Sequence, residues 1–271
     1  MNEQTKQPSG RNWWGPLWPL GEALRFLTII PIPGMPPMSE QSIARAIPLL
    51  PLAGALIGGL LVALGIVSGA LWDSWVRAVL VVVGWGVITS GLHLDGLSDT
   101  FDAVMSWRTR ERKLEIMKDS RIGAMGALAL IAVLALKVAW LHAAGDGWWQ
   151  AVWLAPALGR WADTYGIFRF PPAREGGLGR EFQARARRGD FAISTTTALI
   201  LALVLAGPRG LLALALVWVV SSALARWWTR DLGGLTGDTY GALCEIAEVV
   251  TLAVLSASFE LQQAIPHSKL I

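Results

Sequence analysis

Seven long apolar segments, separated by shorter polar stretches, dominate the pattern of hydrophobic and polar positions. They cover residues 46–71, 76–94, 122–143, 148–168, 191–206, 211–228 and 242–259. A helix that crosses a bilayer needs about 20 predominantly apolar residues, and only the fifth segment is clearly short of that length. The pattern therefore predicts an all-α fold, a polytopic integral membrane bundle of about seven transmembrane helices.

Composition supports this class. Hydrophobic residues make up 54% of the chain and charged residues only 16%, with a mean hydropathy of +0.48, which suits a membrane protein better than a soluble domain. Cys244 is the only cysteine. A disulfide within the chain and a zinc site built from several cysteines are therefore excluded.

Basic residues predict the orientation of the bundle. They gather after the second, fourth and sixth segments: Arg108, Arg110, Arg112, Lys113, Lys118 and Arg121; then Arg174, Arg180, Arg185, Arg187 and Arg188; then Arg226 and Arg230. The turns near Asp73, Asp146 and Pro208 are nearly free of Lys and Arg. Because cytoplasmic loops carry the excess of basic residues, we expect the basic loops and the N-terminus inside and the C-terminus outside.

The chain before the first segment contains a shorter apolar stretch. Residues 21–33 are too few to span a membrane and end in two prolines, which predicts an interfacial or re-entrant helix with Arg25 toward the cytoplasm. We expect residues 1–20 to form an N-terminal tail, residues 21–260 a single transmembrane catalytic domain, and residues 261–271 a C-terminal tail.

Small residues on the first segment predict how it packs. Gly54, Gly58 and Gly59 give it a face without side chains. Such a face allows a neighbouring helix to approach closely. We interpret these glycines as packing residues rather than functional ones.

An acidic motif follows the second segment, and it is the chemical centre of the sequence. Asp95, Asp99 and Asp102 are spaced i, i+4 and i+7, so a helix would place them within roughly a 60° arc. Three carboxylates so close are expected to share a hard divalent cation, Mg²⁺ above all. The alternative is a solvated helix start with three unrelated acids. His93, just before them, is either a base or a hydrogen-bonded structural residue.

The start of the third segment offers a candidate anion site. Asp119, Ser120 and Arg121 precede Gly123 at a predicted helix N-terminus, where Arg121 would hold a phosphate and Asp119 would add a metal ligand. The alternative is an ordinary helix start, capped by Asp119 or Ser120, with Arg121 reaching to the membrane surface.

Charges inside the apolar segments are functional candidates by default. We expect Lys137 to reach the outer surface near Trp140. Arg160 and Asp163 are i, i+3 neighbours that either neutralise each other or bring Arg160 to the acidic motif. The loop 170–190, rich in Pro, Gly and Arg and without an apolar period, is either a mobile cover for an anionic substrate or a topological anchor.

The last segment begins with a glycine-rich turn, Gly233 to Gly237, that would let backbone N–H groups approach a phosphate. Asp238, Glu245 and Glu248 follow, and we expect all three carboxylates at the cytoplasmic depth of the acidic motif. Two glutamates near the start of a span indicate a metal or substrate site, the alternative being a polar contact between helices.

Together these motifs resemble one enzyme family. They are Phe26-Leu27-Thr28 with Pro31 and Pro33, His93-Leu94-Asp95-Gly96 with Asp99 and Asp102, Asp119-Ser120-Arg121-Ile122-Gly123, and Gly233-Gly234-Leu235-Thr236-Gly237-Asp238 with Glu245. Four separated motifs in this order resemble the bacterial cobalamin synthases, also called adenosylcobinamide-GDP ribazoletransferases. The resemblance covers roughly residues 21–259. Ser98 and Phe101 stand where smaller residues are expected.

The resemblance implies a Mg²⁺-dependent transferase of the bacterial inner membrane, with its active site facing the cytoplasm. Its substrates would be adenosylcobinamide-GDP and α-ribazole or α-ribazole 5′-phosphate, and GMP would leave. Membrane lipids and other cobalamin-assembly enzymes are further expected partners, and no nucleic acid is expected.

On the same resemblance, the expected catalytic residues are Asp95, Asp99, Asp102, Arg121, His93 and Asp238. The expected substrate-binding residues are Arg25, Asp119, Ser120, Arg160, Gly237 and Glu245, and the expected metal ligands are Asp95, Asp99, Asp102, Glu245 and Glu248. The alternatives fit less well. Another Mg²⁺-dependent membrane alcohol phosphotransferase or a prenyltransferase would show a different acidic pattern, and a cation transporter would place its acids at the membrane midplane.

Overall fold

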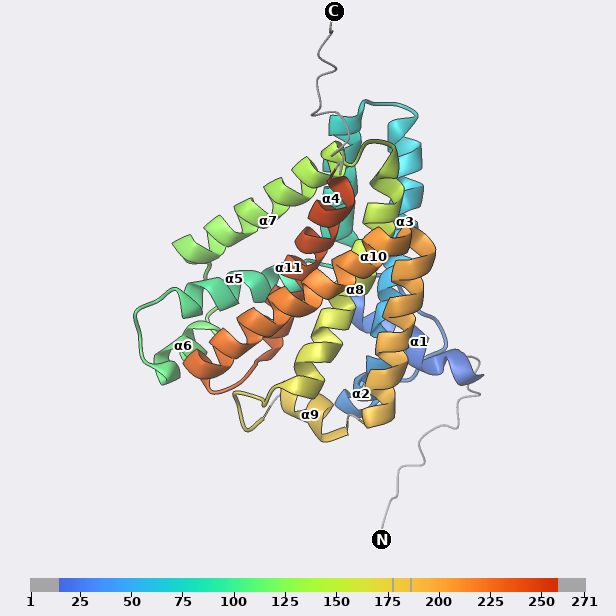
Figure 1. Cartoon of the computed structure of the whole chain (residues 1–271). Helices are drawn as coiled ribbons and strands as arrows, with labels where there is room; N and C mark the ends of the chain where they lie inside the picture. Colours follow the sequence, from blue (N-terminus) through green and yellow to red (C-terminus); the bar gives the residue numbers. More distant parts are fainter. Residues whose placement is uncertain (1–14, 177, 186, 258–271) are drawn as a thin grey trace, which may run out of the picture.

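The computed structural model describes residues 15–176, 178–185 and 187–257, and these parts are helical nearly throughout (Figure 1). In chain order the elements are η1 (Gly15–Leu17), α1 (Trp18–Leu27), α2 (Glu40–Ala46), η2 (Ile47–Leu49), α3 (Leu50–Gly69), α4 (Ser74–Ile88), α5 (Leu92–Val104), α6 (Arg110–Ile116), α7 (Ala124–Ala143), η3 (Gly145–Gly147), α8 (Trp148–Arg169), α9 (Leu178–Arg185), α10 (Arg188–Leu232) and α11 (Gly237–Ser256). Within the described residues the β-structure consists of an isolated bridge between Pro172 and Leu235. The predicted all-α fold is confirmed.

The number of membrane spans differs from the prediction. Four helices of the described chain are long and apolar enough to cross a membrane: residues 42–69, α7, α10 and α11. The bent pair of α4 and α5 adds a fifth if it is counted as one broken span. Each of the seven predicted segments overlaps a helix, but α8 is too polar to be one of these candidates and α10 unites two segments. The count of seven is therefore not confirmed.

A sharp break separates α4 from the acidic motif, where the sequence suggested a continuous span to residue 94. The axes of α4 and α5 differ by 89°. Ser90 and Gly91 adopt left-handed backbone angles, with φ of 53° and 64°, which a helix interior does not allow. The break turns α5 across the bundle, and in Figure 1 it runs nearly at right angles to α4.

The predicted turn near Pro208 is present as a kink within α10. Gly207 has φ 56° and ψ −137°, angles that essentially only glycine tolerates, and Pro208 follows it. The helix changes direction here, so its two halves run to different parts of the molecule (Figure 1).

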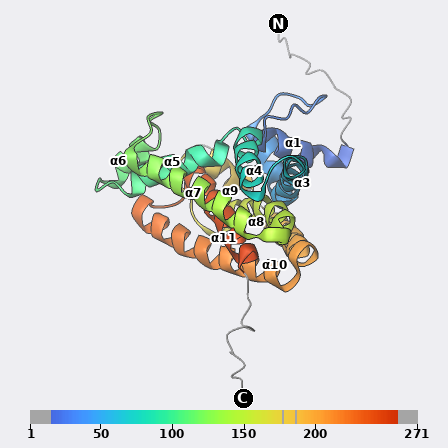
Figure 2. The same cartoon turned by 90° about the horizontal axis from the view of Figure 1, so that it is seen from above.

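Helix α8 lies at the centre of the molecule. It packs against α3, α10 and α11, and most of its residues from Ala151 to Ile167 are buried. Viewed from above, α8 and α11 lie between α3 and α4 on one side and α10 on the other (Figure 2). The core therefore surrounds the two helices that carry Arg160, Asp163, Glu245 and Glu248.

The N-terminal segment forms α1, which is ten residues long and ends at Thr28, before the prolines. This agrees with a short helix that does not span. Because α1 begins at Trp18, the expected tail of residues 1–20 includes its first residues. Residues 1–14 and the expected tail 261–271 lie outside the described residues.

The basic segments gather at one end of the molecule. Helices α6 and α9 lie toward the lower end in Figure 1, whereas the α3–α4 and α7–α8 connections lie toward the upper end. The loop 170–190 is more ordered than its composition indicated, because it contains α9 and the bridge of Pro172 to Leu235. Hydrogen bonds from Ala173 N to Leu235 O and from Leu235 N to Pro171 O, both 2.8 Å, attach it to the start of α11.

The glycines of α3 provide a test of this packing. A Cβ at Gly58 would overlap the backbone of Trp153 on α8, whereas one at Gly59 would lie 3.7 Å from the nearest atom of the Trp153 side chain. We expect Gly58→Ala to lower the free energy of unfolding by about 1–3 kcal/mol, the cost of overpacking. Gly59→Ala, its matched control, should leave stability unchanged. Thermal unfolding in detergent measures both, and equal midpoints for the two variants would contradict the packing of α3 on α8.

Candidate functional site

Helix α5 crosses the first turn of α11 at very close range. A Cβ at Gly96 would lie 2.7 Å from the backbone oxygen of Asp238, and one at Gly241 would lie 3.1 Å from Cα of His93. A side chain at Gly96 would overlap the backbone of α11, and one at Gly241 would require α5 to shift by a few tenths of an ångström. The crossing brings the acidic motif of α5 next to Asp238, although the two are separated by more than 130 residues in the sequence.

The segment 92–104 is a helix, so Asp95, Asp99 and Asp102 lie on one helical face as their spacing predicts. Asp95 is exposed and Asp99 half-buried, and the charge of Asp99 is opposed by those of Asp95, Asp238 and Asp102. Arg174 is the cation that acts on Asp99 in the opposite sense. Hard carboxylate oxygens concentrated in this way, with little compensation from the protein, fit a divalent cation such as Mg²⁺.

Asp102 has a structural partner that the sequence did not reveal. Its Oδ2 accepts a hydrogen bond from Gly123 N at 2.7 Å and its Oδ1 accepts one from Gly126 N at 2.8 Å. Asp102 thus caps the N-terminus of α7, where no side chain of the helix's own N-cap residue does so. Its two oxygens fix α5 against α7, which leaves Asp95, Asp99 and Asp238 as the freer carboxylates.

Arg174, from the loop between α8 and α9, is the basic side chain closest to this face. Its Nη2 donates to Leu114 O at 3.1 Å and lies 3.7 Å from Oδ2 of Asp238. Nothing in the sequence separates Arg174 from the other arginines of its loop. The hydrogen bond between Ala173 and Leu235 places Arg174 next to the start of α11, and this pairing could not be predicted from the sequence.

The predicted anion site before α7 is exposed, and its arginine pairs with a neighbouring aspartate. Arg121 is 85% exposed, and its Nη2 contacts Oδ2 of Asp119 at 2.5 Å. The hydrogen bonds from Arg121 lower the pKa of Asp119 to about 2, so this exposed carboxylate stays ionised. Ser120 is also exposed. The alternative interpretation, a cap by Asp119 or Ser120, is wrong because Asp102 caps α7.

Lys137 is buried, which corrects the expectation that it reaches the membrane surface. Its Nζ donates to Glu245 Oε2 at 2.7 Å, forms a second ion pair with Glu248 and lies 4.3 Å from the ring centre of Trp85. Arg160 forms an ion pair with the other oxygen of Glu248. Lys137 is roughly 20 Å along α7 from Ala124 at 1.5 Å per residue, so this cluster lies well inside the bundle.

These ion pairs change the interpretation of Glu245 and Glu248. Both were expected as metal ligands at the cytoplasmic depth of the acidic motif, and Glu245 also as a substrate ligand. In the structure both are buried, and cations of the protein occupy their oxygens. The alternative of a polar contact between helices describes this geometry.

His93 links the buried cluster to α5. Arg160 Nη2 lies 3.1 Å from His93 Nδ1, and His93 Nε2 lies 3.6 Å from Asp163 Oδ2. Because a guanidinium only donates, Nδ1 accepts and the ring carries its proton on Nε2, facing Asp163. Arg160 and Asp163 therefore do not simply neutralise each other, and Arg160, an expected substrate ligand, is fully buried among protein groups.

Arg25 also has a partner within the protein. Its Nη2 lies 2.6 Å from Oε2 of the buried Glu22 on the same helix, and its Nη1 donates to Pro36 O at 2.7 Å. These contacts fold the chain after α1 back over the helix. They hold Arg25, another expected substrate ligand, at the α1 surface.

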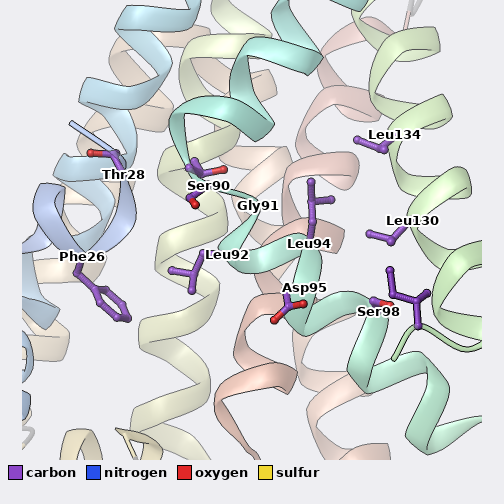
Figure 3. Close-up of a pocket in the computed structure, with 12 residues that line it drawn as sticks. Phe26, Thr28, Ser90, Gly91, Leu92, Leu94, Asp95, Ser98, Leu130 and Leu134 are labelled. Carbon is purple, nitrogen blue, oxygen red and sulfur yellow. The ribbon is translucent and has the colours of Figure 1, made fainter. Parts of the chain in front are cut away.

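Two cavities meet at Asp95. The larger, of about 630 Å³, lies between the end of α1, the α4–α5 break and α7, and Figure 3 shows Asp95 between Leu92 and Ser98 with Leu130 across from them. The smaller, of about 210 Å³, is lined by Asp95, Asp238, His93, Asp163, Tyr240 and Gly237. The first has the volume of a small-molecule site, whereas the second admits only part of a ligand.

This architecture defines an all-α membrane protein with a carboxylate-lined pocket where α5 meets the first turn of α11. The family model described as cobalamin-5-phosphate synthase matches residues 19–256. The chain belongs to this family, and the resemblance found in its motifs is confirmed.

Three relatives show how close the similarity is. An adenosylcobinamide-GDP ribazoletransferase of Roseiflexus sp. (strain RS-1) is 68% identical over 256 residues, 94% of this chain and 96% of the relative. One of Herpetosiphon aurantiacus is 56% identical over 238 residues, 88% of this chain and 96% of the relative. One of Acetivibrio thermocellus is 36% identical over 229 residues, 84% of this chain and 92% of the relative. No solved structure matches the chain significantly.

The ion pairs of Lys137 predict a large effect on stability. We expect Lys137→Met to destabilise the protein by about 3–5 kcal/mol, because it leaves Glu245 and Glu248 buried with too little positive charge. Adding Glu245→Gln should restore part of the loss, since it removes the unmatched charge. Lys118→Met, an exposed control, should have no effect. Unfolding midpoints after extraction in detergent test this, and a Lys137→Met protein as stable as the control would refute the assignment.

Proposed function

We propose that this protein joins α-ribazole, or α-ribazole 5′-phosphate, to adenosylcobinamide-GDP and releases GMP. The product is adenosylcobalamin or its 5′-phosphate. Family membership and the activity named for its relatives support this function. The single observation that carries it in the structure is the carboxylate face of Asp95, Asp99 and Asp238, beside Arg174 and at the junction of the two cavities.

Asp95, Asp99 and Asp238 are the residues that would hold Mg²⁺. They supply hard oxygen donors from two helices, and within the described part of the chain Arg174 is the cation that opposes their mutual repulsion. When bound, the ion neutralises negative charge on the pyrophosphate and on the departing GMP. Asp102 positions these ligands because it caps α7 and so fixes α5. Glu245 and Glu248 are not ligands in this proposal, because they form buried ion pairs with Lys137 and Arg160.

Arg174 orients the phosphate groups in this proposal. It is 28% exposed, is steadied by the carbonyl of Leu114, and keeps donors on its guanidinium beside the acidic face. A guanidinium binds phosphate oxygens through paired hydrogen bonds. Arg121, which the sequence favoured for this role, would need the loop before α7 to close over the site.

The larger cavity, of about 630 Å³, holds one part of the bulky donor in this proposal. Its walls are mostly apolar, from Phe26 and Leu92 to Leu130 and Leu134, with the carboxylate of Asp95 at one point (Figure 3). Such a wall fits the apolar faces of a corrinoid ring while the pyrophosphate reaches Asp95. The smaller cavity then receives the acceptor from the other side of Asp95.

We place the protein in the inner membrane with this site toward the cytoplasm. The support is that α6 and α9, which carry basic residues, lie toward the lower end in Figure 1, and that α5 contacts α6. The same basic segments are suited to anionic lipid head groups. Association with other cobalamin-assembly enzymes is part of this proposal.

The proposed ligand set is tested by Asp99→Asn. We expect release of GMP from adenosylcobinamide-GDP and α-ribazole 5′-phosphate to fall about 100-fold or more, because the amide removes a charged ligand. Chelation of Mg²⁺ should abolish turnover by the unaltered protein, and added Mg²⁺ should restore it. Asp146→Asn, at the opposite end of the molecule, is the control and should be fully active. Full Mg²⁺-dependent turnover by Asp99→Asn would contradict the scheme.

The two arginines are separated by comparing Arg174→Met with Arg121→Met. Loss of a charge-assisted hydrogen bond to phosphate costs about 1.5–3 kcal/mol, so KM for the GDP-activated donor should rise about 10- to 100-fold in Arg174→Met. The exposed Arg121 should matter much less. Steady-state kinetics with varied donor measures both variants. A greater loss in Arg121→Met would instead assign the phosphate to the arginine before α7.

A further inference from the structure

Two residues that line the smaller cavity carry buried polar atoms that lack hydrogen-bond partners. Asp163 is 5% exposed and Tyr240 also 5%, and both line the cavity. Asp163 Oδ1 and the Tyr240 hydroxyl have no hydrogen-bond partner. A buried polar group left unpaired costs about 1–3 kcal/mol, so two in one cavity indicate that a ligand supplies the missing partners.

Neighbouring side chains orient Asp163. Its Oδ2 faces Nε2 of His93, the nitrogen that carries the ring proton, because Arg160 donates to Nδ1 on the other side. Arg160 is itself held by Glu248. Asp163 thus has one oxygen directed to His93, while its Oδ1 has no hydrogen-bond partner by geometry and the thiol of Cys244 is the weak donor nearby. This is the arrangement of a positioned proton acceptor.

The charges around Asp163 favour proton uptake. The buried groups that act on it are Arg160 on its own helix, His93 on α5, and Tyr240, Cys244, Glu245 and Glu248 on α11, with Lys137 of α7 paired to both glutamates. Three carboxyls, Asp163, Glu245 and Glu248, face two permanent cations, Lys137 and Arg160. Before the transfer, with all three carboxyls ionised, the cluster carries one uncompensated negative charge, and a proton accepted from the substrate by Asp163 removes it.

A metal ion is the competing explanation for this corner. Donor atoms of His93, Asp163 and Cys244 lie within 4.8 Å of one another. However, Arg160 Nη2 lies 3.1 Å from His93 Nδ1 and its charge acts on all three groups. Because this contact places the ring proton on Nε2, the nitrogen that faces Asp163 has no free lone pair and cannot bind a metal ion. A permanent cation at this position disfavours a second one.

We propose that Asp163 is the general base of the transfer and that Tyr240 also binds the acceptor. This inference rests on the proposed function. The acceptor oxygen forms a bond to the phosphorus nearest the cobinamide, the phosphoanhydride bond to the GMP oxygen breaks, GMP leaves with that electron pair, and the hydroxyl proton passes to Asp163 Oδ1. The cavity of about 210 Å³ holds the hydroxyl-bearing sugar, and Asp95 and Asp238 line its phosphate end.

The test measures kcat and KM for GMP release, together with cobalamin formation, in Asp163→Asn. A general base contributes about 100- to 10,000-fold, so kcat should fall at least about 100-fold while KM for the donor stays within about threefold. Tyr240→Phe should raise KM for α-ribazole 5′-phosphate several-fold. Tyr165→Phe is the matched control, because its hydroxyl is also buried but pairs with Ser222 at 2.6 Å, and it should keep both constants.

Each outcome decides the inference. A folded Asp163→Asn protein with unaltered kcat overturns it, and so does the same result in Asp163→Ser, which serves if the asparagine variant does not fold. Loss of donor binding without a kcat defect would make Asp163 a binding residue and also overturn the assignment. Failure of the unaltered protein to release GMP would instead refute the proposed function, so the two failures are distinguishable.

Discussion

The double ion pair of Glu248 is the interaction on which the rest of the site depends. One oxygen pairs with Lys137 of α7 and the other with Arg160 of α8, so a single side chain of α11 joins three helices inside the bundle. In an apolar surrounding such charges are tolerated only when they compensate each other. The chain of contacts continues outward, because Arg160 also binds His93 on α5. Helix α5 is therefore positioned from within, by charge, as well as by packing at its surface.

Three local features complete the placement of α5. The left-handed angles at Ser90 and Gly91 turn it away from α4, the absence of a side chain at Gly96 lets it touch α11, and Asp102 ties it to the first turn of α7. Each constraint acts on a different part of the helix. Asp95 and Asp99 consequently project from a rigid element rather than a loop, which is the arrangement that holds ligands at a fixed separation.

The sequence predicts the features that arise from local patterns. Runs of apolar residues located the helices, and the i, i+4, i+7 spacing placed Asp95, Asp99 and Asp102 on one helical face. It did not predict features that depend on distant partners. Lys137 reads as a surface-seeking lysine because Trp140 is near it in sequence, yet its counter-ions are more than 100 residues away. The position of Arg174 depends on the bridge between Pro172 and Leu235, and the direction of α5 depends on its crossing with α11. The hydrophobic periodicity of the sequence predicts neither contact.

Compensation of charge separates the two groups of acids in this protein, although their residue types are similar. Glu245 and Glu248 face Lys137 and Arg160 and are satisfied by the protein itself. Asp95, Asp99 and Asp238 face each other, and among the described residues Arg174 is the opposing charge that acts on Asp99 and Asp238. In the proposed function a pyrophosphate would bring further negative charge to that face, and Coulomb repulsion across a few ångströms in a partly buried site would exclude it without added cations. The excess of carboxylate at the pocket is thus the physical argument for a divalent ion that accompanies the substrate, and the near balance of charge in the interior leaves little excess negative charge to attract such an ion there.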